Sequence, residues 1–123
     1  PYDPRYLEGI EHYNRGRFRD CRETREDYWL EEHGPGRGVL QGLIQVAVCL
    51  HHFGNGNTRG AKKLYLTSVG YLQEYRPQHQ GLDVEKLFRE FEACLKPVME
   101  STDEFPKIDI EPDLIPEIHL AQE

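Results

Sequence analysis

Apolar and polar residues follow one another along most of the chain with the spacing of an α-helix. Leu87, Phe91, Cys94 and Leu95, for example, recur at intervals of three and four residues, which places them on one helix face. Residues typical of helix N-caps precede three such segments: Asp3, Asn57 or Thr58, and Asp83. The pattern predicts five helices, over residues 4–15, 18–32, 39–53, 58–75 and 83–96.

The third predicted helix differs from the others because it is apolar on nearly every face. Its sequence, VLQGLIQVAVCLHHF, leaves no broad polar side that would face water. A helix of this kind is surrounded by protein. The fold class we predict is therefore all-α, an antiparallel bundle of about five helices with a largely buried third helix.

Glycine and proline mark the connections and the end of the bundle. HGPGRG, residues 33–38, and QHQG, residues 78–81, are predicted loops. Beyond residue 100 the chain has several prolines and scattered apolar residues, too broken for a helix. We expect a single helical-bundle domain over residues 1–100. Residues 101–123 should form an extended C-terminal arm that lays its apolar residues on the bundle or on a neighbouring subunit: Ile108, Ile110, Leu114 and Ile115.

Composition narrows the class of protein. With 22 acidic and 15 basic residues, the net charge is −7, so we expect no nucleic-acid binding, which depends on neutralising phosphates. No apolar run has the length of a membrane span, and no signal-peptide pattern is visible, so we expect a cytoplasmic protein without a membrane partner. Only five of the basic residues are lysines, which leaves salt adaptation of the surface open.

The three cysteines, Cys21, Cys49 and Cys94, are expected to be reduced; Cys21 beside Arg22 is the alternative candidate for a reactive thiol.

The buried third helix carries one line of polar residues, and this line is the main candidate site. Gln41, Gln45 and His52 stand at i, i+4 and i+11 on an otherwise apolar helix. A buried polar group without a partner costs on the order of 1–3 kcal/mol, so partners are expected on the second helix. The candidate polar cluster is accordingly Arg22, Glu23, Glu26, Gln45 and His52.

The stretch HHFGNGNTRGAKK, residues 51–63, invites two other interpretations. A P-loop needs a different glycine spacing and a preceding strand, so GNGN is predicted to be a helix–helix turn. His51 and His52 are adjacent and diverge by about 100°, so they cannot both face one metal. A basic patch follows the turn and is a candidate contact for an anion or an acidic partner, unless it is only a solvated face: Arg59, Lys62 and Lys63.

These segments resemble a known family, domain-of-unknown-function family 309. Over roughly residues 8–75 the chain is similar to the family patterns GxFxxxHExxExxW and LxGLIQxAVALHHxxxGNxxGA. The first pattern is matched at Gly16, Phe18, Glu23, Glu26 and Trp29. The second is matched at Leu40, Gly42, Leu43, Ile44, Gln45, Ala47, Val48, His51, His52, Gly56, Asn57, Gly60 and Ala61. Arg22 stands where the family usually has His. The resemblance implies an all-helical fold with a polar cluster between two helices, and it implies no activity.

Three interpretations of the cluster remain open. It is a buried network that fixes the packing of two helices, a pocket for a small molecule or a protein partner, or a hydrolytic or metal site with Glu as base and His as ligand. Arg22 counts against the last, because a fixed cation repels a metal and occupies the carboxylates. We therefore predict a non-enzymatic binding or assembly protein without cofactor or metal, and leave a homo-oligomer open. The alternative is a metal-assisted or carboxylate/His hydrolase using Glu23, Glu26 and His52.

Overall fold

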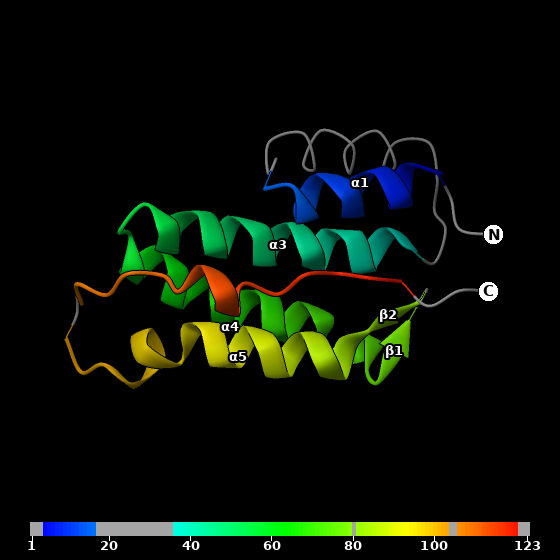
Figure 1. Ribbon diagram of the computed structural model, residues 1–123. Coiled ribbons are helices and arrows are strands. Elements are labelled where there is room, and N and C mark those ends of the chain that lie inside the picture. The colour runs from blue at the N-terminus through cyan, green and yellow to red at the C-terminus, as the bar shows by residue number, and fades with distance from the viewer. Residues whose placement is uncertain (1–3, 17–35, 80, 104–105, 121–123) are drawn as a thin grey trace.

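The computed structural model describes residues 4–16, 36–79, 81–103 and 106–120, and these residues are mostly helical (Figure 1). Within them lie four α-helices: α1 (Pro4–Asn14), α3 (Gly36–Gly54), α4 (Thr58–Leu72) and α5 (Val84–Glu100). The helical class predicted from the sequence is thereby confirmed. The segment 18–32 lies outside the described residues, so the count of five helices stays a prediction.

From α3 onward, each element runs back along the one before it (Figure 1). The helix α4 returns along α3, α5 returns along α4, and the C-terminal tail returns between α3 and α5. The helix α1 packs on α3, on the side away from α4. None of the helices in the described part of the chain combines the length and the apolar character that crossing a membrane requires.

The helix α3 lies at the centre of the core, as its all-round apolarity predicts. Val39, Leu43 and Val46 are fully buried, and Leu50 is only 3% exposed. Residues from α1, α4, α5 and the tail complete the same cluster, among them Tyr13, Ala61, Phe91 and Ile118. Burial of this apolar surface is the main favourable contribution to folding.

Two glycines let α3 and α4 approach closely. A Cβ atom at Gly42 would overlap the side chain of Leu72, and one at Gly38 would overlap the ring and hydroxyl of Tyr75. Tyr75 lies in the 3₁₀ turn η1 (Gln73–Tyr75) that extends α4. The loop predicted at 33–38 is therefore wrong for residues 36–38, which form the first turn of α3. The absence of a side chain at Gly38 is what leaves room for Tyr75.

The predicted loop at 78–81 is also corrected, because it contributes to a small β-hairpin. Strand β1 (Gln78–His79) pairs antiparallel with β2 (Leu82–Asp83), with Gln78 opposite Asp83 and His79 opposite Leu82. Gly81 in the turn has φ of 75°, a backbone conformation that glycine adopts without strain. Such short strands have too little sequence pattern to be distinguished from a loop.

The helix α5 continues beyond its predicted end and through a proline. Asp83 caps the helix as predicted, accepting a hydrogen bond from the Lys86 N–H at 3.0 Å. The helix then runs through Pro97 to Glu100, four residues beyond the predicted end. Val98, one residue after the proline, is fully buried. Packing of Val98 holds the last turn in place although Pro97 cannot donate a backbone hydrogen bond.

The tail, residues 106–120, crosses the molecule in a mostly extended conformation interrupted by the 3₁₀ turn η2 (Pro112–Leu114). The Thr58 hydroxyl donates to the carbonyl of Pro106 at 2.7 Å, and the Tyr13 hydroxyl donates to that of Pro116 at 3.0 Å. Ile108 and Ile110 are half-buried against the core, whereas Leu114 and Ile115 are each 41% exposed. Ile118 of the tail is only 3% exposed, although the sequence analysis did not select it.

We expect Gly42→Ala to lower the free energy of unfolding, because its methyl group would press on the buried Leu72 side chain. Overpacking of this kind typically costs about 1–3 kcal/mol, more than the helix propensity gained. Gly70→Ala in α4 is the matched control: nothing lies within 4 Å of a Cβ there, and the residue is exposed. The control should raise stability by about 0.5–1 kcal/mol. Denaturant unfolding measures both, and equal stabilisation by the two substitutions would contradict the close helix contact.

The described cysteines should resist thiol reagents in the folded protein. Burial raises the pKa of the Cys49 thiol to about 12 and that of Cys94 to about 11, and both are unpaired. Because the thiolate is the reactive species, neither should react at pH 8 until the protein unfolds. We expect the native Cys21→Ala variant to show no rapid reaction with a thiol reagent. In denaturant, the same variant should show two reactive thiols. Rapid labelling of either remaining thiol in the native variant would contradict the buried positions.

Candidate functional site

The helix α3 carries a partly exposed stripe on a surface whose described side chains are mostly buried. Gln41, Gln45, Val48 and His52 are each half-buried. At about 100° per residue, these four positions fall within about 60° of one another around the helix axis. The line of polar residues predicted from the sequence therefore exists as a narrow strip that solvent reaches. We call these four residues the α3 stripe.

His52 at the end of the α3 stripe is held by the turn that joins α3 to α4. Asn57, the N-cap of α4, accepts a hydrogen bond through Oδ1 from the Gly60 N–H at 2.9 Å. This contact fixes the orientation of the carboxamide and turns its Nδ2 toward His52 Nδ1, at 3.2 Å. Since an amide nitrogen only donates, His52 Nδ1 accepts. The neutral imidazole accordingly carries its proton on Nε2.

This tautomer restricts what His52 can do chemically. A histidine that binds a metal through Nε2 usually donates its Nδ1–H to a carboxylate or carbonyl oxygen. Here the group beside Nδ1 is a donor, so that arrangement would set two donors against each other. Neutral His52 instead presents an N–H at Nε2. It is suited to donating a hydrogen bond and not to accepting a proton or ligating a metal at that atom.

The neighbouring His51 is held separately and points elsewhere. Its Nε2 lies 3.1 Å from Asn55 Nδ2, and its side chain is exposed. The two imidazole rings are 6.2 Å apart between centroids and inclined by 53°. The structure therefore agrees with the expectation that adjacent histidines do not face one site together.

The sequence of the rest of the turn, residues 54–61, follows from the packing of α3 against α4. Gly56 has φ of 81°, which favours glycine. A Cβ at Gly60 would lie 2.6 Å from Asn57 Nδ2, so a side chain there would displace the cap. Ala61 is fully buried, and its carbonyl accepts a hydrogen bond from Cys49 Sγ at 3.1 Å. GNGN is a helix–helix turn, as predicted.

Of the predicted polar cluster, the structure describes two members. Gln45 and His52 lie on the same stripe of α3, seven residues and about two helical turns apart. Arg22, Glu23 and Glu26 lie outside the described residues, so the cluster as a whole stays a prediction. Asn57, the residue that fixes the tautomer of His52, was missed. Its position five residues after His52, across a glycine-rich turn, is the signal that could have identified it.

The predicted basic patch lies on the first two turns of α4. Arg59 and Lys63 are exposed and Lys62 is half-buried. The Gly60 N–H at this helix end is already bound by Asn57. Contact of the patch with an anion or an acidic partner stays a prediction.

Within residues 4–16, 36–79, 81–103 and 106–120, no three His, Cys, Asp or Glu side chains gather closely enough to hold a metal ion.

We expect Asn57→Asp to move the proton of neutral His52 from Nε2 to Nδ1. The carboxylate still caps α4, but its second oxygen offers Nδ1 an acceptor in place of a donor. Long-range ¹H–¹⁵N correlation of the imidazole distinguishes the two tautomers. Asn55→Asp places the same charge in the same turn beside His51 and should leave His52 unchanged. A parent protein with the proton already on Nδ1 would contradict the assignment.

Two comparisons place the chain among known proteins. Residues 6–64 match the model of a family described as "Domain of unknown function (DUF309)". The chain is similar to "Uncharacterized protein YpuF" of Bacillus subtilis (strain 168), with 36% identity over 90 residues. That match covers 70% of this chain and 52% of the relative, so the chain spans about half the length of the curated relative. Neither description states an activity.

Proposed function

The chain belongs to the DUF309 family, and on that premise we propose that it is a non-enzymatic binding protein whose ligand contacts the α3 stripe. The ligand is a small molecule or a segment of a protein partner that forms hydrogen bonds with uncharged side chains. The cytoplasm is the proposed location. A homo-oligomer is compatible with the proposal but is not required by it.

One observation carries the proposal: among the described side chains of α3 from Val39 to Leu50, only Gln41, Gln45 and Val48 are not buried, and with His52 they form a narrow, mainly polar strip. Gln45 and His52 offer amide and imidazole groups at the two ends of about two helical turns, with the apolar Val48 between them. Sites for ligands commonly combine an apolar lining with a few polar groups fixed in position. Asn57 fixes His52 in this way.

The tautomer of His52 favours binding over hydrolysis. A hydrolase based on Glu23, Glu26 and His52 would need the imidazole to accept a proton or to ligate a metal. The Nδ1 lone pair is engaged with Asn57, and Nε2 carries the proton. The N–H at Nε2 can donate a hydrogen bond to an oxygen atom of the ligand.

The three charged residues predicted for the cluster would then adjust the site without carrying out chemistry in it. We propose that Arg22 pairs with Glu23 or Glu26 and holds these carboxylates ionised, leaving the uncharged groups of α3 to contact the ligand. The same pairing would fix the packing of the helices if it is buried.

Photocrosslinking from the α3 stripe tests the proposal. A small aliphatic diazirine residue at Val48 should yield an adduct in cells, whose intact mass distinguishes a small molecule from a protein. The same residue at Leu66, which is 60% exposed on α4, is the matched control and should not yield that adduct. Gln45→Ala should reduce the Val48 adduct severalfold, because it removes a hydrogen-bonding group from the strip.

Two outcomes would count against a binding role. The first is an adduct at Val48 formed only with the chain's own residues, which would show that the protein covers the stripe itself. The second is an adduct that appears equally from Leu66, which would show nonspecific contact.

A further inference from the structure

The end of the tail is held in the manner of a bound peptide. The carboxamide of Asn14 contacts both backbone groups of Ile118: Nδ2 donates to the carbonyl at 2.7 Å, and Oδ1 accepts from the N–H at 2.8 Å. The Tyr13 hydroxyl donates to the carbonyl of Pro116 at 3.0 Å. Two adjacent residues at the end of α1 thus bind the backbone of an extended segment that follows them by more than 100 positions.

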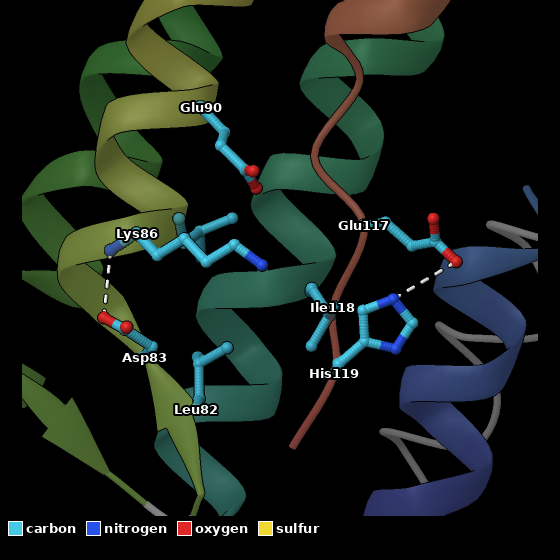
Figure 2. Close-up of a pocket in the computed structure, with 8 residues that line it drawn as sticks. Leu82, Asp83, Lys86, Glu90, Glu117, Ile118 and His119 are labelled. Atoms are coloured by element: carbon cyan, nitrogen blue, oxygen red, sulfur yellow. Dashed lines mark hydrogen bonds and ion pairs between the residues drawn. The ribbon is translucent and has the colours of Figure 1, made fainter. Parts of the chain in front are cut away.

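Side chains of this segment alternate between the protein and solvent. Pro116 and Ile118 are buried, whereas Ile115, Glu117 and His119 are exposed. Figure 2 shows Ile118 on the tail facing Leu82 and Lys86 of the β2–α5 segment across a small cavity. Backbone hydrogen bonds combined with pockets for alternate side chains are a recurrent mode of peptide recognition.

The groove around the tail is not completely filled. Three cavities, of about 20, 240 and 430 Å³, are each bordered by tail residues. The largest lies between the end of α1, Leu50 of α3 and residues 112–117 of the tail. Leu114 and Ile115 also stay 41% exposed. The tail thus leaves open space beside it, as expected of a segment that can dissociate without global unfolding.

Charged residues border the cavities on the helix side and on the tail. Each cavity has a basic residue on the helix side and an acidic residue on the tail: Lys86 with Glu117, Arg89 with Asp113, and Arg15 with Glu117. In Figure 2 the Lys86 side chain extends from α5 toward the tail. Asp83 and Glu90 are acidic residues on the helix side, His119 of the tail lies 3.4 Å from Glu117, and Arg15 also binds Glu11 at 3.0 Å. Charges of both signs thus border the groove, and the recognition features that it offers are the backbone contacts and the buried positions of Pro116 and Ile118.

We propose that this groove is a recognition site for an extended peptide of another protein containing Pro-x-Ile, and that residues 116–118 of the chain's own tail occupy it until displaced. The site is separate from the α3 stripe. Leu50, which borders the largest cavity, lies nine residues from Gln41 and therefore on the opposite face of α3. The inference does not rest on the proposed function.

Displacement of the tail within the full chain tests the proposal. Ile118→Asp should release the tail, because it places a carboxylate where an apolar side chain is buried. A fluorescent peptide of residues 111–120, EPDLIPEIHL, should then bind the variant, measured by anisotropy. It should bind the parent roughly tenfold or more weakly, because the tethered tail competes at an effective concentration on the order of 1 mM.

Two controls test whether the peptide binds in the groove. Adding Asn14→Ala to the Ile118→Asp protein removes the contacts to the peptide backbone and should weaken binding at least tenfold. The same peptide with Asp at the position of Ile118 should not bind. If the folded Ile118→Asp protein binds no peptide, or binds it equally without Asn14, the proposal is overturned.

Hydrogen exchange of the unmodified protein provides a test that needs no substitution. The Ile118 amide, bound to Asn14, should exchange faster than the core amides of α3, because the tail opens separately from the bundle. Equal protection at Ile118 and at Leu50 would show that the tail opens only with global unfolding and would overturn the proposal. A dimer with mutually exchanged tails would also overturn it, because the occupant would then be a second copy.

Discussion

The close contact of α3 with α4 is the constraint on which the other features depend. Gly38 and Gly42 stand one helical turn apart on α3, and each is covered by a large side chain, Tyr75 or Leu72. Farther along the same helix, Cys49 donates to the carbonyl of the buried Ala61. Small residues at all these positions let two helices pack along their whole length at a density that larger residues would prevent.

Helices packed this closely need a tight turn, and that turn determines the chemistry of His52. Gly56 takes the positive φ that the reversal requires, and Asn57 caps the second helix. Capping fixes the Asn57 carboxamide, and the fixed carboxamide fixes the imidazole of His52. The family pattern ending in GNxxGA is therefore explained by helix packing alone. A pair of histidines within such a pattern is not by itself evidence of catalysis.

What could be predicted from the sequence was set by local physical rules. The burial of Val39 and Leu43 follows from the apolarity of the whole helix, and the caps at Asn57 and Asp83 follow from side-chain chemistry within three residues. The β-hairpin is local, but its strands of two residues each are too short to show a strand pattern, whereas the burial of Ile118 depends on partners distant in sequence. Local pattern contains no information about these partners.

The candidate site on α3 and the tail groove differ in the same way, because one depends on residues close in sequence and the other on residues far apart. Gln45 and His52 share a stripe because helical geometry relates them, so their spacing alone predicts it. Asn14 and Ile118 are separated by almost the whole chain, and their paired hydrogen bonds become visible only once the fold is known.

The part of the chain that matches the family model also bears on this groove. The side chains that bind the backbone of the tail, Tyr13, Asn14 and Thr58, all lie within residues 6–64, whereas the tail lies beyond them. Leu82 and Leu87, which border the small cavity at Ile118, lie outside this region as well. The polar contacts to the tail backbone thus come from residues 6–64, which match the family model. The pocket for the apolar side chain of Ile118 comes from the part of the chain that follows them. Since backbone contacts are indifferent to sequence, choice among peptides would depend on the part of the chain outside the family region.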